Sequence, residues 1–453
     1  MEQRNAKSEA EVKLSSLSGR DFRCPGENAK RKEQRLYSSA FRCKIQKAAG
    51  GQGGHRPPGI YFVKESGFPF GIKGSKDMQF RDLKAQYTAL KPEIDAAMQK
   101  VAADGNFISG AQVAELETAL AEYVGVKHCV TCGNGTDALT MVLMGWNLGP
   151  GDAVFVPDFT FFASGEVVSF EGATPVFVDV DADTFNLDPS KLEEAILAVK
   201  AEGRLIPKAV VAVDLFGLPA NYRAIRPITE KYGLLLLEDG AQGFGGSMDG
   251  RRACSFGDAS TTSFFPAKPL GCYGDGGAIF TDDDALADYL RSIRVHGKGS
   301  FKYDNVRIGM NSRLDTLQAA ILQPKFQAFR EYELEAVNRA AGWYTERLKD
   351  LVKTPVVPEG FGSSWAQYTL TLESREQRDA VQAALKEQGI PTMVYYPKPM
   401  HAQTAFADVP SIPGLPGFPV TDRLCACVLS LPMHPYLGES NVEFICDKLK
   451  KLL

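Results

Sequence analysis

Residues 263–277 read Ser-Phe-Phe-Pro-Ala-Lys-Pro-Leu-Gly-Cys-Tyr-Gly-Asp-Gly-Gly and contain one lysine in an unusual setting. Lys268 follows an apolar run, lies between Pro266 and Pro269, and precedes four glycines. Desolvation in such a constrained segment would lower the pKa of the lysine amine, as a lysine that attacks an aldehyde requires. The glycines let backbone approach a bound molecule closely. The stretch therefore predicts a Schiff-base lysine at the end of a buried strand.

A second apolar run, residues 234–239, reads Leu-Leu-Leu-Leu-Glu-Asp and ends in an acidic pair. A carboxylate at the C-terminal end of a strand points into the crevice where α/β proteins bind their ligands. Asp239 there could pair with the protonated pyridine nitrogen of pyridoxal phosphate (PLP) and keep that cofactor an electron sink. A helix N-cap or a metal ligand is the alternative for this residue.

A glycine-rich turn, residues 132–139 (Cys-Gly-Asn-Gly-Thr-Asp-Ala-Leu), joins a short apolar run to a helix. Backbone N–H groups at the start of that helix make an anion site, and Thr136 adds a hydroxyl. The alternative is a capped helix that binds nothing. Cys129 and Cys132 have CxxC spacing, but no second pair of ligands follows, so buried thiols are favoured over a metal or redox site.

β-rich runs alternate with helical runs along most of the chain, which indicates an α/β fold. Runs that are apolar throughout predict strands buried on both faces, and hence a mainly parallel sheet. We expect a large domain over 78–325 and a smaller C-terminal α+β domain over 326–453. Residues 1–77 lack any period and are expected to be a disordered extension. The expected strands are 153–156, 175–180, 209–213, 234–237, 261–265, 278–281 and 367–372, and the expected helices are 83–101, 113–123, 313–349, 375–388 and 441–452.

Charge and cysteine content exclude several classes of function. Residues 1–77 hold 16 Lys+Arg and 8 Asp+Glu, so the remaining residues hold 35 and 47 and carry a net charge of −12. This acidic body argues against nucleic acid as a partner. The sequence contains no run of eighteen apolar residues, so no membrane span is predicted. The nine cysteines form no disulfide framework, which favours a reducing, cytoplasmic environment.

Four segments together resemble the DegT/DnrJ/EryC1/StrS family of sugar aminotransferases: GNGTDAL at 133–139, LEDGAQ at 237–242, SFFPAKPLGCYGDGG at 263–277 and GMNSRLDTLQAAIL at 309–322. The resemblance covers 78–453, in order and with matching spacing. Within the family the chain is most similar to aminotransferases that act on UDP-linked 2-acetamido-3-keto-glucuronic acid. It implies a fold-type-I PLP-dependent transferase, with a place in polysaccharide and O-antigen biosynthesis.

The resemblance assigns roles around the cofactor. Lys268 would form the Schiff base and shuttle a proton between Cα and C4′, Asp239 would bind the pyridine nitrogen, and Gln242 the ring's O3′. Phe161 would stack on the ring, although a plain core aromatic is the alternative. The expected phosphate contacts are Gly135, Thr136, Ser263 (whose alternative is a solvated strand-end hydroxyl) and Asn311, which would reach the site of the partner subunit in a homodimer.

The resemblance also assigns residues to the substrates. Arg313 would face a carboxylate, either that of glutamate or that of a uronic acid, although a helix-surface arginine is the alternative. Residues 394–401 match the family's sugar-binding loop, which puts Tyr395, Tyr396 and His401 near the sugar. Tyr395 stands where the subgroup commonly has histidine, and His401 where it often has asparagine, so the identity of the sugar is the least defined part.

The function that follows is a ping-pong transfer of an amino group from glutamate to a nucleotide-linked keto sugar, at C3 of a UDP-linked 3-keto uronic acid. A dTDP-linked 3-keto-6-deoxyhexose is the alternative substrate. A sugar dehydratase of the same family would typically have histidine in place of Lys268. A PLP-bound regulatory protein without catalysis is the rival from another class. Asp214, which ends an apolar run, belongs either to the cofactor pocket or to a turn.

Overall fold

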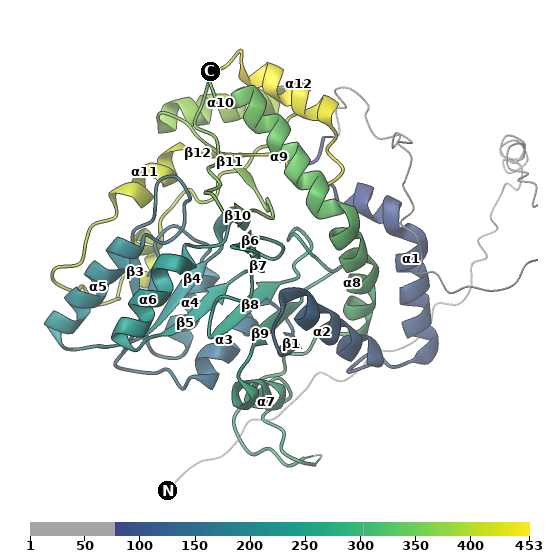
Figure 1. Ribbon diagram of the computed structural model, residues 1–453, viewed down its shortest axis with the longest axis vertical. Helices are drawn as coiled ribbons and strands as arrows, with labels where there is room; N and C mark the ends of the chain where they lie inside the picture. The colour runs from purple at the N-terminus through teal and green to yellow at the C-terminus, as the bar shows by residue number, and fades with distance from the viewer. Residues whose placement is uncertain (1–77, 302) are drawn as a thin grey trace, which may run out of the picture. The chain divides into compact units, whose positions relative to one another are not determined.

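A seven-stranded sheet in the order β1-β9-β8-β5-β4-β2-β3 is the centre of the computed structural model, which describes residues 78–301 and 303–453 (Figure 1). Strands β3, β2, β4, β5 and β8 pair in parallel, whereas β9 is antiparallel to both β8 and β1. The predicted mainly parallel α/β sheet is confirmed, and the predictions for residues 1–77 lie outside the described part. The strands are β1 (His128–Cys132), β2 (Asp152–Pro157), β3 (Thr174–Val178), β4 (Ile206–Val213), β5 (Leu235–Asp239), β8 (Ala259–Ser263) and β9 (Gly277–Thr281).

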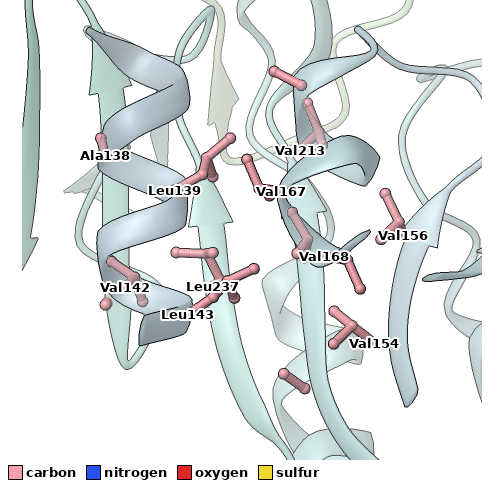
Figure 2. Packing of buried hydrophobic residues seen from close by; sticks show 14 of the residues in the cluster. Ala138, Leu139, Val142, Leu143, Val154, Val156, Val167, Val168, Val213 and Leu237 are labelled. Carbon is pink, nitrogen blue, oxygen red and sulfur yellow. The ribbon is translucent and has the colours of Figure 1, made fainter. Parts of the chain in front are cut away.

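Alternate residues of the central strands pack into two separate hydrophobic cores, one on each face of the sheet. On β2, Val154 and Val156 pack with the first cluster, whereas Ala153 and Phe155 pack with the second. Figure 2 shows the first cluster, where side chains of α3 and α4 meet those of β2, β4 and β5. Both faces of the sheet are therefore buried, which explains why the strands read as continuous apolar runs. The helices against the first face are α3 (Gly135–Gly145), α4 (Ala163–Phe170) and α7 (Asp284–Ile293), and those against the second are α5 (Pro189–Glu202) and α6 (Tyr222–Tyr232).

Side-chain caps and glycines set the ends of several helices. The Asp82 carboxylate caps α1 (Leu83–Asp104), and Gly105 ends it in the left-handed region at φ 68°. Helix α2 (Ala111–Val124) likewise ends at a left-handed glycine, Gly125. Helix α1 lies beside α8 (Thr316–Ala328) at the edge of the sheet domain (Figure 1).

The C-terminal part of the chain has a core of its own, built on a two-stranded antiparallel sheet. The domain boundary expected between 325 and 326 falls inside a continuous helical stretch and stays a prediction. The remaining elements are β6 (Ser247–Met248), β7 (Arg251–Arg252), β10 (Phe361–Gly362), β11 (Tyr368–Thr371), β12 (Val428–Leu431), α9 (Leu334–Leu348), α10 (Arg375–Glu387), α11 (Pro419–Cys427), α12 (Glu439–Leu449), and the 3-10 turns Leu215–Gly217, Met400–Ala402 and Thr404–Phe406.

The helix expected over 313–349 is not a single α-helix. Helix α8 begins at Thr316, and a π-helical segment, Phe329–Glu333, separates it from α9. In that segment the N–H of Leu334 bonds to the carbonyl of Phe329, five residues earlier. The extra residue per turn turns Glu333 inward, where its side chain is buried.

Candidate active site

The C-terminal ends of four neighbouring parallel strands carry the polar residues of the site. Asp158 follows β2, Asp214 follows β4, Asp239 ends β5 and Ser263 ends β8. Because these ends lie at one edge of a parallel sheet, they face the crevice where ligands of α/β proteins bind. The sheet order β8-β5-β4-β2 brings together residues that are more than a hundred positions apart.

Lys268 lies in a turn just beyond β8, where its N–H donates to the carbonyl of Phe265 at 2.8 Å. Gly271 permits this turn, because a Cβ there would lie 2.6 Å from the carbonyl oxygens of Phe265 and Pro266. Burial lowers the pKa of the Lys268 amine, the charge of Asp239 raises it, and the charge of Arg81 lowers it further. The direction is that expected for a lysine that reacts as a free amine.

Asp239 is 5% exposed and lies between two hydrogen-bond donors. Its Oδ2 accepts from Ser164 Oγ at 2.8 Å, and its Oδ1 accepts from the N–H of Ala241 at 3.2 Å. Burial raises the pKa of this carboxyl, whereas the two donors and the Lys268 charge lower it. Asp239 caps no helix, so it is free to carry a negative charge toward a cationic ring nitrogen.

Gln242 joins the sheet edge to the loop that was expected to bind the sugar. Its Oε1 accepts from the N–H of Phe216 at 2.7 Å, and its Nε2 donates to the hydroxyl of Tyr396 at 3.0 Å. The Tyr396 ring lies 6.2 Å from the ring of Phe161 and 5.7 Å from that of Tyr395. Phe161 is 53% exposed, so the alternative of a core aromatic is wrong for this residue.

The start of helix α3 lies against Ser263. A Cβ at Gly135 would be 2.8 Å from Ser263 Cβ, so only glycine allows this approach. The side chain of Asn134 caps the helix by accepting from the N–H of Asp137 at 2.8 Å. The half-buried Gly135 and Thr136 form the first turn of α3, where backbone N–H groups attract anions.

The segment before α8 is tied to this helix start by Ser312. The Ser312 hydroxyl accepts from the N–H of Gly133 at 2.9 Å and donates to Asp137 Oδ2 at 2.6 Å. Its neighbour Asn311 is exposed and its neighbour Arg313 is half-buried. Neither side chain makes a hydrogen bond or ion pair within the described part of the chain. Because Arg313 precedes α8, the alternative of a helix-surface arginine is wrong.

His401 pairs with Asp158, which follows strand β2. Its ring Nδ1 is 2.6 Å from Asp158 Oδ2, its backbone N–H donates to Asp158 Oδ1 at 2.7 Å, and its ring stacks on Phe418. Burial raises the pKa of Asp158 to about 6, although the contacts with His401 lower it. His401 makes no hydrogen bond with the other expected site residues of the described chain.

Asp214 supports the turn under the site. Its Oδ1 accepts from the N–H of Ala220 at 2.9 Å and from the hydroxyl of Tyr222 at 2.8 Å, so the turn-capping alternative holds. The carboxyl is fully buried near Glu238, and burial followed by the Glu238 charge raises its pKa well above the usual value. Gly243 packs directly on it, because a Cβ there would lie 2.4 Å from Asp214 Cβ.

Sequence reasoning missed Ser164, Asp158 and Arg81. Asp158 had a usable signal, because it ends an apolar strand as Asp239 does. Ser164 and Arg81 had none, since their partners are 75 and 187 residues away. The two CxxC thiols are buried as expected, and burial raises the pKa of Cys129 well above its usual value and that of Cys132 to about 12.

The described residues fit a phosphate-bearing aromatic aldehyde. The Gly135 turn, closed against Ser263, would hold the phosphate, and the exposed face of Phe161 would hold a ring. Lys268 supplies the amine and Asp239 the carboxylate. Within residues 78–301 and 303–453, no helix is both long and apolar enough to cross a membrane.

Comparison with known proteins identifies relatives over the same region. A family model described as the DegT/DnrJ/EryC1/StrS aminotransferase family matches residues 88–450. A UDP-2-acetamido-2-deoxy-3-oxo-D-glucuronate aminotransferase of Pseudomonas aeruginosa is 46% identical over 373 residues, covering 82% of this chain and 99% of that protein. A UDP-N-acetyl-3-dehydro-alpha-D-glucosamine 3-aminotransferase of Acidithiobacillus ferrooxidans is 40% identical over 373 residues, covering 82% of this chain and 97% of that protein.

A solved structure agrees with the fold. The crystal structure of a DegT DnrJ EryC1 StrS aminotransferase from Brucella abortus matches with a TM-score of 0.80 at 52% identity, covering 83% of this chain and 99% of that one. The family match spans more than half of the chain, and the relatives are matched over nearly their whole length. The chain therefore belongs to the DegT/DnrJ/EryC1/StrS aminotransferase family and is an aminotransferase that uses pyridoxal phosphate.

Proposed function

We propose that the protein transfers an amino group from glutamate to C3 of a UDP-linked 3-keto uronic acid. The observation that carries this proposal is the 46% identity, over 99% of its length, to a relative named for UDP-2-acetamido-2-deoxy-3-oxo-D-glucuronate. A second relative, at 40% identity, is also named for a UDP-linked 3-keto sugar. The reaction is ping-pong, because donor and acceptor use the same cofactor site one after the other.

The residues around Lys268 divide the work of the proposed reaction. Bound PLP supplies an electron-withdrawing ring that stabilises negative charge at the donor carbon. Lys268 Nζ would hold the cofactor. It would move a proton from Cα of the donor to C4′ in the first half-reaction and from C4′ to C3 of the sugar in the second. Asp239, oriented by Ser164, would keep a negative charge at the ring nitrogen, and Gln242 would bond the ring hydroxyl. Phe161 would cover one face of the ring.

The phosphate and the substrate carboxylates use different parts of the site. We assign the phosphate to the first turn of α3, through Gly135 and Thr136, with Ser263 beside it. Arg313 has no anionic partner within the described chain, which supports a role in binding a carboxylate of glutamate or of the uronic acid. Asn311 is exposed beside Arg313, and we assign it to the phosphate of a second subunit in a homodimer with shared active sites.

Two further assignments belong to the proposal. Tyr395, Tyr396 and His401 would line the sugar subsite, since Tyr396 lies beside Phe161 and bonds to Gln242. A cytoplasmic location is supported by the free thiols of the described cysteines, which are typical of a reducing compartment. A dTDP-linked neutral 3-keto sugar is the alternative acceptor, favoured by His401 at a position where the uronate subgroup often has asparagine.

A substrate panel tests the proposal. The full-length protein with PLP is given glutamate and either UDP-linked 3-keto uronic acid, its neutral UDP-linked counterpart, or a dTDP-linked 3-keto-6-deoxyhexose, and 2-oxoglutarate release is measured. We expect turnover with the uronic acid to exceed that with the neutral sugars at least tenfold. Equal turnover would reject the uronate assignment, and failure of glutamate to bleach the visible absorbance would favour a regulatory protein.

Two variants act as controls for the panel. Lys268→Ala should abolish 2-oxoglutarate release while leaving the unfolding temperature close to that of the parent protein. Arg313→Ala separates the two carboxylates, because a loss confined to the sugar half-reaction assigns Arg313 to the uronic acid. A loss confined to the glutamate half-reaction assigns it to the donor instead.

A further inference from the structure

Arg81 contacts the loop that carries Lys268 from a distant part of the sequence. Its Nη2 lies 2.7 Å from the carbonyl oxygen of Lys268 and 3.3 Å from that of Pro269. On the other side of the Lys268 Cα, the N–H of Lys268 donates to the carbonyl of Phe265 at 2.8 Å. The backbone of Lys268 is therefore held at both its N–H and its carbonyl, and Arg81 makes the second contact.

The segment that presents Arg81 is itself fixed at both ends. The N–H of Met433 donates to the carbonyl of Phe80 at 3.1 Å, which ties the segment to the C-terminal part of the chain. Asp82 then caps helix α1 through the N–H of Ala85 at 2.8 Å. Arg81 thus lies between two anchored residues, so its guanidinium is held against the lysine loop with little freedom to leave.

A buried carboxylate, Glu333 in the π-helical segment, stands behind Arg81. Its two oxygens accept from Gln86 Nε2 at 2.9 and 3.1 Å, and Oε1 also accepts from the hydroxyl of Tyr436 at 2.7 Å. Glu333 is only 2% exposed, and its charge raises the pKa of Arg81, which burial lowers to about 10. Arg81 therefore stays charged at neutral pH although it is half-buried.

The charged and titratable groups around Lys268 and Arg81 come from three elements and two loops. Asp239 of β5 faces Lys268, whereas Lys325 of α8 and Glu333 face Arg81. Lys325 is 1% exposed, and burial lowers its pKa to about 8. His434 lies near Arg81 and Asp82, and burial lowers its pKa to about 4, so it is neutral. Among the basic residues named here, Arg81 is thus the one next to Lys268 that keeps its positive charge throughout the neutral pH range.

We propose that Arg81 is a positioning residue for Lys268, which fixes the backbone of the lysine loop through its contacts with the carbonyls of Lys268 and Pro269 and places a permanent positive charge beside that loop. The proposal rests on the proposed function, in which Lys268 is the residue that holds PLP. An arginine suits both tasks, because its planar guanidinium offers several donors and stays charged. A lysine at the same place would keep the charge but lose one of the two carbonyl contacts.

The two tasks can be separated with two substitutions. Arg81→Gln removes the charge and keeps an amide that can donate to a carbonyl, whereas Arg81→Lys keeps the charge. Lys84→Gln is the matched control, because it removes one positive charge from an exposed position on the adjacent helix α1. All variants are studied as the full-length chain.

The decisive measurement is the pH dependence of Lys268 acetylation in the cofactor-free protein, read by peptide mass spectrometry. We expect Arg81→Gln to move the labelling midpoint to higher pH and to lower the labelling rate at pH 7 about threefold or more. Lys84→Gln and Arg81→Lys should leave the midpoint unchanged. An unchanged midpoint in Arg81→Gln, even with a lower unfolding temperature, would show that Arg81 is merely structural.

A second measurement covers the case in which Arg81→Gln does not fold. Arg81→Lys should then bind PLP about tenfold more weakly than the parent protein at an unchanged labelling midpoint, and equal affinity would overturn the proposal. Failure of the proposed function is seen separately, by reducing the loaded protein with borohydride. PLP mass on a peptide other than that of Lys268 would reject the role of Lys268, whereas the acetylation profile does not depend on the cofactor.

Discussion

Ser164 donates a hydrogen bond from its hydroxyl to Asp239 Oδ2 at 2.8 Å, joining the first turn of helix α4 to the end of strand β5. Both residues are buried, and the hydroxyl of Thr160 lies 3.2 Å from that of Ser164, so a short polar chain leads away from the carboxylate. Since burial raises the pKa of Asp239, such a donor is needed to keep the carboxyl ionised beside a cationic ring nitrogen.

Replacing Ser164 by alanine is therefore expected to weaken PLP binding. A hydrogen bond to a charged group contributes roughly 1.5–3 kcal/mol, so the dissociation constant should rise about tenfold or more. Equilibrium titration of the visible absorbance measures this constant. Ser169→Ala, on the exposed face of the same helix, is the control and should bind PLP as the parent protein does. An unchanged constant in Ser164→Ala would contradict the assigned role of Asp239.

Tyr396→Phe removes the acceptor for the Gln242 amide. Gln242 is 4% exposed, so its Nε2 would lose its partner, at a cost of about 1–3 kcal/mol in the free energy of unfolding. Urea unfolding measures the change in stability. Tyr395→Phe is the matched control, because no hydrogen bond of the Tyr395 hydroxyl occurs in the described structure. Equal stability of both variants would show that the contact contributes nothing.

Asp214→Asn should change how stability depends on pH. Burial and the charge of Glu238 raise the pKa of Asp214, and burial raises that of Glu238, so this pair retains a proton in the folded state that the unfolded chain releases near pH 4. The pair's contribution to stability is complete below that pH and is lost as pH rises toward the folded pKa.

An asparagine at position 214 stays neutral, so its stability relative to the parent protein should increase from pH 5 to pH 8. Urea unfolding at both pH values measures the difference. The control is Asp350→Asn, at an exposed position, for which the relative stability should not change with pH. A constant difference between Asp214→Asn and the parent protein would show that the pair is already fully ionised at pH 5.

His401→Ala leaves Asp158 buried without its side-chain partner. The pKa of Asp158 is already raised to about 6 by burial, and removing the histidine should raise it further. Because the raised pKa makes ionisation costly in the folded state, the variant should lose about 1–3 kcal/mol at pH 8 and less at pH 5, where the carboxyl is protonated. Unfolding experiments at both pH values measure this loss.

Two further variants define the origin of that effect. Asp158→Asn in the His401→Ala background should restore part of the stability at pH 8, since it removes the unpaired charge. Thr404→Ala, at an exposed position of the same loop, should be neutral at both pH values. A loss of equal size at pH 5 and pH 8 would mean that His401 acts by packing on Phe418 rather than by pairing with Asp158.

The sequence was sufficient to predict those strands and site residues whose pattern lies within one short segment. Six of the seven strands of the large sheet followed from apolar runs. Lys268 and Asp239 followed from motifs at strand ends, whereas Gln242 followed from the family resemblance. Contacts between distant segments, such as Arg81 with Lys268, had no sequence signal because neither partner restricts the other locally. The long helix was predicted without its π segment, since the apolar spacing continues through it. Lys325 has the pattern of a surface lysine but is 1% exposed, because α1 packs over α8.

The π-helical segment Phe329–Glu333 is a point at which the chain could lose one residue without disturbing the helices on either side. A π turn holds one residue more than an α turn, so a deletion within the segment would leave one uninterrupted α-helix. Tyr344 of α9 would then still face its core, whereas the same deletion at Gly342 would rotate all later residues by about 100°. The shortened protein would keep its fold but lose the inward position of Glu333. Chains of this family that lack the extra residue should therefore carry no half-buried arginine at the position of Arg81.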